Sequence, residues 1–149
     1  MKSYSKIYYD TAMEYQAGRN GKLKDYKKAI EYLEMSIQEE KNKDNLAEMG
    51  WIYECGFGVE VDELKSHQMF LEAADLGDGL AQWMVGAAFY NGRIVERDSM
   101  KAIFYLTLAM HNPEFDDELI SFMADDAREW VEELSEEINY QCIFISNKY

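Results

Sequence analysis

Several features that mark other protein classes are scarce in this 149-residue sequence. Two cysteines, Cys55 and Cys142, lie far apart and form no Cys-x-x-Cys pair, so neither a disulfide scaffold nor a zinc knuckle is indicated. The longest apolar run, residues 83–90, is far shorter than the roughly 20 residues that a membrane span needs. The N-terminal residues contain no apolar stretch typical of an export signal. We therefore expect a cytoplasmic protein with reduced thiols.

Basic residues are also scarce. The sequence has 15 lysines and arginines against 29 acidic residues, which gives a formal charge of -14. Such a chain is repelled by phosphate groups, so we expect neither nucleic acid nor a membrane surface as its partner. The charge is uneven: residues 1–43 carry +2, residues 44–112 carry -7, and residues 113–149 carry -9. An acidic surface of this kind favours a basic protein as the partner.

Apolar residues, by contrast, are plentiful enough for one folded domain. Hydrophobic residues make up 48% of the sequence and aromatic residues 14%. The single proline, Pro113, and the lack of a Ser/Gly-rich linker give no sign of a second domain. Apolar-periodic stretches of about 12 residues alternate with glycines, and β-branched alternating runs are missing, which predicts an all-α fold.

The sequence repeats itself at an interval of 36 residues. A set of eight positions in residues 50–73 recurs as Gly86, Phe89, Gly92, Val95, Asp98, Lys101, Tyr105 and Ala109. A weaker copy, 37 or 38 residues earlier, covers residues 12–36, with an insertion in residues 18–24. A repeat of this length typically forms one helical hairpin, which must stack on its neighbours to bury its apolar face.

Each copy has a glycine that can end a first helix and, six or seven residues later, an aspartate that can cap a second one. These residues are Gly18, Gly56 and Gly92, followed by Asp25, Asp62 and Asp98. Gly86 and Ala102 predict a close approach of the two helices in the last hairpin. The full pattern predicts helices at residues 4–17, 25–39, 45–55, 62–76, 80–91, 98–111, 115–134 and 135–145, without a sheet.

The run Ala-Ala-Asp-Leu-Gly-Asp-Gly-Leu-Ala at residues 73–81, followed by Gly86, Phe89 and Gly92, resembles the Sel1-like repeat, a relative of the tetratricopeptide repeat. The resemblance covers residues 45–112 well and 5–38 more loosely. It implies an α-α superhelix of about three hairpins, at residues 5–38, 45–76 and 81–112. Residues 113–149 then form an acidic helical cap, and the chain is one domain. Two positions depart from the family pattern: Ala12 replaces a glycine and Asn45 replaces an alanine.

The same resemblance implies which residues line the concave surface of the superhelix. They lie two, six and nine residues after the leading-alanine position of each copy, which is occupied by Ile7, Asn45 and Ala81. These residues are Tyr9, Met13, Gln16, Ala47, Trp51, Glu54, Trp83, Ala87 and Tyr90. Trp and Tyr are common anchors of binding surfaces, so these residues are candidates for holding a partner. The alternative is that Trp51 and Trp83 pack between neighbouring helices, since tryptophan is well buried on average.

Catalytic and metal-binding patterns are weak. His67 and His111 have no ligand partner at helical spacing, and we expect His67 to be solvated near the start of its helix. Cys55 with His67 lacks an orienting acid. Acidic pairs such as residues 125–126 are more typical of a solvated cap than of a metal site. We therefore predict no enzyme activity, no metal and no cofactor.

The sequence thus predicts an interaction module that binds another protein through a concave aromatic groove. Its acidity and small size suggest an immunity or antitoxin-like protein that neutralises a basic toxin or effector. The alternative is a regulatory adaptor or chaperone that holds a peptide segment, for which the acidic cap would be irrelevant.

Overall fold

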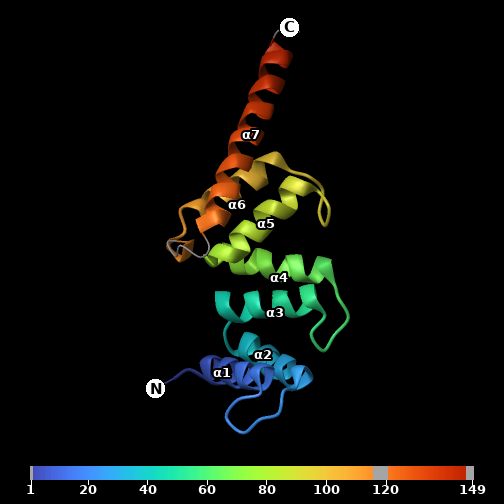
Figure 1. Cartoon of the computed structure of the whole chain (residues 1–149), viewed down its shortest axis with the longest axis vertical. Coiled ribbons are helices and arrows are strands. Elements are labelled where there is room, and N and C mark those ends of the chain that lie inside the picture. The colour runs from blue at the N-terminus through green and yellow to red at the C-terminus, as the bar shows by residue number, and fades with distance from the viewer. Residues whose placement is uncertain (1, 116–120, 147–149) are drawn as a thin grey trace. The chain divides into compact units, whose positions relative to one another are not determined.

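The computed structural model describes residues 2–115 and 121–146 (Figure 1). Within these residues the chain is helical and has no strand, which confirms the all-α prediction. The elements are α1 (Tyr4–Ala17), α2 (Tyr26–Glu39), α3 (Lys43–Cys55), α4 (Glu63–Asp75), α5 (Gly79–Asn91), α6 (Ser99–Met110), the short 3₁₀ helix η1 (Pro113–Phe115) and α7 (Ser121–Ser146). The first six helices lie within two residues of the predicted bounds. The chain divides into two compact units, unit 1 (Met1–Leu76) and unit 2 (Gly77–Tyr149).

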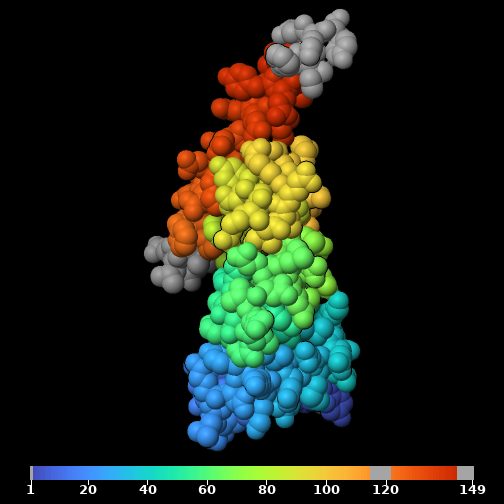
Figure 2. All heavy atoms as spheres, turned by 90° about the vertical axis from the view of Figure 1, so that its right-hand side faces the viewer, coloured from blue at the N-terminus to red at the C-terminus, as the bar shows by residue number. Residues whose placement is uncertain are grey.

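The C-terminal part differs from the prediction. Instead of two helices meeting at residues 134–135, one helix, α7, continues from Ser121 to Ser146. Ser135 was expected to start a new helix, but its Oγ donates to the Val131 carbonyl one turn back, at 2.6 Å, and no glycine or proline interrupts the backbone. Residues 116–120 of the predicted helix lie outside the described residues. In the space-filling view α7 lies directly against the helices of the third repeat (Figure 2).

The predicted hairpin turn is confirmed in all three copies. In the second copy, Gly56 has a left-handed φ of 70° and Asp62 caps α4 by accepting from the Lys65 amide. The Asp62 amide donates to the Tyr53 carbonyl at 3.0 Å, and Lys65 Nζ lies 4.2 Å from the centre of the Tyr53 ring. The equivalent residues in the other copies are Gly18, Asp25, Tyr15 and Lys28, then Gly92, Asp98, Phe89 and Lys101. One short sequence pattern thus closes each hairpin by a cap, a backbone bond and a cation–π contact.

The core of unit 1 joins both of its hairpins. Ala12, Ile30 and Leu33 of the first hairpin pack with Met49 and Ile52 of α3, and all five side chains are buried. Ala12 stands where the later copies have glycine and is fully buried, so the first hairpin accommodates one methyl group there. At Gly50 an added Cβ would lie 2.9 Å from the Phe70 ring.

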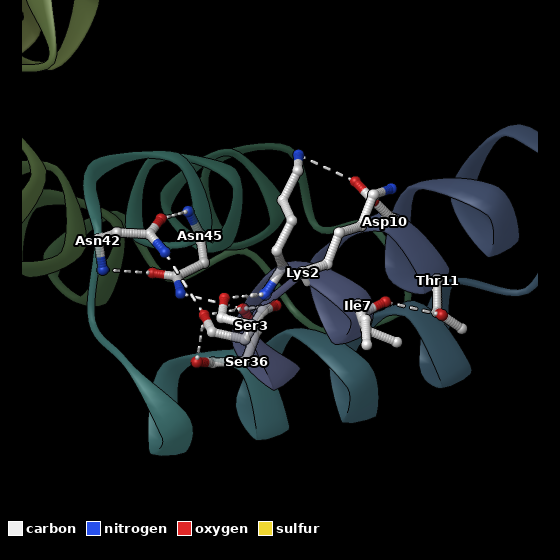
Figure 3. Close-up of polar contacts among 10 residues, drawn as sticks. Lys2, Ser3, Ile7, Asp10, Thr11, Ser36, Asn42 and Asn45 are labelled. Atoms are coloured by element: carbon white, nitrogen blue, oxygen red, sulfur yellow. Dashed lines mark hydrogen bonds and ion pairs between the residues drawn. The ribbon is translucent and has the colours of Figure 1, made fainter.

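The second departure from the family pattern, Asn45, also has a structural role (Figure 3). Asn45 and Asn42 form a capping box at the start of α3, in which each side chain accepts from the other residue's backbone amide. The Asn45 amide group donates to Ser36 Oγ at 3.1 Å and to the Glu40 carbonyl at 2.9 Å. Ser36 in turn donates to the Ser5 carbonyl of α1. This buried network ties the end of the first hairpin to the start of the second.

In unit 2, α5 and α6 approach as closely as the sequence predicts. Gly86 is buried, and a Cβ added to it would lie 2.6 Å from Leu106 Cγ and 3.1 Å from the Leu106 backbone nitrogen. The buried side chains of α7 include Met123, Ala127 and Leu134. Met123 packs with Ala109 of α6 and with Leu80 and Trp83 of α5. This long helix therefore covers one side of the third hairpin.

Candidate protein-binding surface

In unit 1 the candidate binding residues lie on α1 and α3, and all six are partly exposed: Tyr9, Met13, Gln16, Ala47, Trp51 and Glu54. We call this set the α1–α3 surface. The residues between them face inwards, since Ala12, Met49 and Ile52 are at most 3% exposed. The two helices are joined next to the surface by a hydrogen bond of 2.7 Å from Gln16 Nε2 to Glu48 Oε1. The surface therefore rests on a packed core.

The aromatic residues of the α1–α3 surface are held by contacts within unit 1, and Tyr9 packs against its core. The Trp51 ring meets Phe70 edge-on, with ring centres 5.3 Å apart and planes at 81°. Lys6 Nζ lies 5.0 Å from the centre of the Tyr9 ring. Part of each ring remains open to solvent, and an aromatic side chain held in this way can anchor a partner at low entropic cost.

In unit 2 the candidate residues Trp83, Ala87 and Tyr90 of α5 are also partly exposed. Two of them are covered on one side by Trp130 of α7, a residue that the sequence analysis did not single out. The Trp130 ring stacks on Tyr90 at 4.9 Å and on Trp83 at 5.7 Å. Trp130 lies at helical spacing from Met123, Ala127 and Leu134, but nothing in the sequence shows which aromatic residues it meets.

Polar contacts reinforce this aromatic cluster. The Tyr90 hydroxyl donates to Glu133 Oε2 at 2.6 Å, and this carboxylate raises the pKa of Tyr90. Nearby, the Arg97 guanidinium makes two hydrogen bonds to the Glu137 carboxylate, at 3.1 and 2.6 Å, which lowers the pKa of Glu137. The Trp83 Nε1 atom is buried and has no acceptor among the described residues. Trp83 therefore combines a partly exposed ring with the contacts of an inter-helix residue.

The chain is similar in sequence and in structure to proteins of one repeat family. The sequence profile of the Sel1 repeat matches residues 7–40, 46–78 and 79–110. The chain belongs to the Sel1 repeat family. A Sel1 repeat protein from Oxalobacter formigenes has a similar crystal structure, with a TM-score of 0.68 and 25% identity, over 82% of this chain and 88% of that one.

A second crystal structure is that of c5321, described as a protective antigen present in uropathogenic Escherichia coli strains that displays an SLR fold. It matches with 21% identity and a TM-score of 0.45, over 89% of this chain and 37% of that one. No functionally curated protein matches this sequence. Sel1 repeat proteins generally mediate protein–protein interaction, and the family is typically non-enzymatic.

One expectation about the second Sel1 repeat is wrong. His67 is not solvated: it is 7% exposed, and burial lowers its pKa. Although it lies close to the start of α4, it stands at the position that the buried Ile30 and the partly buried Ile103 occupy in the other two repeats. Cys55 and Cys142 are both exposed thiols. Across residues 2–115 and 121–146 there is no cluster of metal-ligating side chains and no helix able to cross a membrane.

Unit 1 also contains a concavity that the sequence analysis did not foresee. It has a volume of about 380 Å³ and lies among α2, α3 and α4, with Ile37, Met49 and Met69 as apolar lining and Glu34 and Lys65 as charged lining. Met49 and Met69 also pack against the core of unit 1. This concavity therefore lies where consecutive Sel1 repeats meet.

Proposed function

We propose that this chain is a non-catalytic interaction module whose α1–α3 surface binds another protein. The observation that carries the proposal is the state of Trp51, which stays partly exposed although Met49 and Ile52 beside it in α3 are buried. Exposed aromatic residues on a rigid helical support are typical of binding surfaces. In unit 2, Trp83 and Tyr90 already contact Trp130, so we assign them a secondary part in binding.

The finer proposal concerns the charge of the partner. The chain carries a net charge of -14, so a basic protein would be drawn to it over long range and would bind at an increased rate. An immunity or antitoxin-like role against a basic toxin is one function of this kind. A regulatory adaptor or chaperone that holds a neutral peptide segment on the α1–α3 surface is the alternative.

The test compares Trp51→Ala with Leu64→Ala, a change at a 55% exposed residue of α4 outside the α1–α3 surface. Proteins captured from a host-cell extract by the wild type and by both variants are quantified by mass spectrometry, and a captured partner is then titrated by calorimetry. We expect Trp51→Ala to weaken binding by about 2 kcal/mol, roughly thirtyfold, and Leu64→Ala to leave it unchanged. Equal affinity of the two variants would refute the assignment of the surface.

Ionic strength separates the two kinds of partner. Screening shortens the range of charge attraction from about 10 Å at 0.1 M salt to about 3 Å at 1 M. For a basic toxin-like partner, we expect the association rate to fall markedly across this range. For a neutral peptide held by an adaptor, the rate would stay flat while Trp51→Ala still weakened binding.

A further inference from the structure

The first hairpin carries residues whose equivalents in the second repeat lie at the contact between the first and second repeats. In the second repeat, Met49 is buried in one core with Ala12 and Leu33 of the first hairpin, and Tyr53 and Met69 pack against that core. Met49 of the second repeat thus shares a core with the repeat before it, and Tyr53 and Met69 flank that core. At the equivalent positions the first repeat has Thr11, Tyr15 and Tyr32, and all three are partly exposed, although Tyr32 also packs against the core of unit 1.

These residues extend into a continuous tyrosine-rich face. Tyr4, Tyr8, Thr11 and Tyr15 lie one after another on a single side of α1, at helical spacing. Neighbouring rings contact each other from Tyr4 to Tyr8, from Tyr8 to Tyr32 and from Tyr32 to Tyr15, with centres 6.5, 6.3 and 5.6 Å apart. We use the name tyrosine face for these five residues, which are Tyr4, Tyr8, Thr11, Tyr15 and Tyr32. Tyr4 is 69% exposed, so the face is open at the start of α1.

Two lysines lie against the tyrosine face, and one of them, Lys22, also pairs with Glu14. Lys22 and Lys28 place their ammonium groups 5.4 and 5.3 Å from the centre of the Tyr15 ring. Residues 1–43, which contain the whole face, form the only one of the three segments with a net positive charge. An acidic, partly aromatic helix would complement this combination of cationic and aromatic groups.

Such a helix is present in the chain itself. Leu134 is the last buried residue among the α7 side chains that the structure describes, and beyond it α7 runs past the ends of α5 and α6 (Figures 1 and 2). Its solvent side carries the exposed residues Glu129, Glu132, Glu136, Tyr140 and Ile143, spaced three or four apart on one face. We call this set the α7 stripe. Tyr140 is 73% exposed, the highest value in unit 2 for a large apolar or aromatic side chain among the described residues.

We propose that a second copy of this chain docks its α7 stripe on the tyrosine face, so that copies associate head to tail. The acidic stripe meets the lysines, and Tyr140 and Ile143 meet the tyrosine rings. Two α7 stripes would repel each other because residues 113–149 carry -9, which disfavours a symmetric contact through the C-terminal ends. A head-to-tail contact does not pair a surface with itself, so it continues into longer assemblies or closes into a ring.

The first measurement is the mass in solution by sedimentation velocity, from micromolar to near-millimolar protein, at low and high salt. We expect the weight-average mass to rise with concentration beyond that of a dimer, and to fall when the salt is raised. Tyr4→Glu and Tyr140→Glu should each abolish this rise. The matched controls Leu64→Glu and Phe104→Glu place the same charge on residues that are 55% and 57% exposed and lie outside both surfaces. They should associate like the wild type.

Mixing the two blocked variants distinguishes the proposed geometry from others. The Tyr4→Glu protein retains an intact α7 stripe, and the Tyr140→Glu protein retains an intact tyrosine face. Their mixture should therefore form a one-to-one complex that grows no further, although each variant alone is monomeric. If Tyr140→Glu alone still dimerised while Tyr4→Glu did not, the tyrosine face would pair with itself and the proposal would be wrong. A wild type that stays monomeric at every concentration would also overturn it.

Discussion

Trp51 in unit 1 and Trp83 in unit 2 were expected to play the same part on a concave surface, but their surroundings differ. The Trp51 ring meets Phe70 of its own hairpin edge-on. Trp83 stacks on Trp130, packs against the Met123 region and buries its Nε1 atom. An aromatic residue at this position of the repeat can therefore contact either a partner protein or another helix of the same chain. Whether the residue binds a partner or the chain's own next helix depends on the segment that comes after the repeat.

The largest predicted effect is a difference in how much stability the protein loses when each of these two tryptophans is replaced by alanine. Removing a large aromatic side chain from a packed site costs about 3–5 kcal/mol, and a partly exposed one costs less. We expect Trp83→Ala to lower the free energy of unfolding by about 2–3 kcal/mol and Trp51→Ala by about half of that. Urea titration followed by circular dichroism measures both.

A double-mutant cycle identifies the cause of the difference. If the Trp83–Trp130 contact is responsible, the costs of Trp83→Ala and Trp130→Ala should not add, with a coupling of about 0.5 kcal/mol or more. Strict additivity, or equal costs for Trp51→Ala and Trp83→Ala, would remove the distinction between the two units. Trp83 would then regain the status of a binding anchor that the family resemblance gave it.

The sequence was informative where one residue type has a local role. Glycines that end helices, aspartates that cap them and the apolar repeat predicted six helices within two residues of their ends. It failed where the outcome depends on contacts between distant segments. Trp130 meets residues 40 and 47 positions earlier in the chain, and no local pattern encodes that pairing. The burial of His67 was missed because its closeness to the start of its helix was given more weight than its position in the repeat.

A middle-sized effect concerns how closely the hairpins pack. A Cβ at Gly86 would meet Leu106 at 2.6 Å and its backbone nitrogen at 3.1 Å, whereas the first hairpin buries a full alanine, Ala12, at the equivalent position. Gly86→Leu should therefore overpack the third hairpin and cost about 1–3 kcal/mol in urea unfolding. Gly50→Ala is the milder comparison, since the added Cβ meets the Phe70 ring at 2.9 Å and a side chain yields more easily than backbone. A cost near zero for Gly86→Leu would mean that α5 and α6 are further apart.

The smallest effect is a pH dependence that distinguishes the second repeat from the other two. Burial lowers the pKa of His67, so the unfolded chain binds a proton at this residue more readily than the folded chain does. The contribution of His67 to stability is thus fully present above its unfolded pKa of about 6.5 and declines as the pH falls below that value.

Ile30 and Ile103 occupy the equivalent positions, so His67→Ile supplies a side chain that the repeat already accommodates. We expect the stability difference between His67→Ile and the wild type to widen in favour of the variant between about pH 7 and about pH 5.5. Parallel urea titrations across this range measure it, and because the carboxylates are common to both proteins, a constant difference would show that His67 does not titrate differently on unfolding.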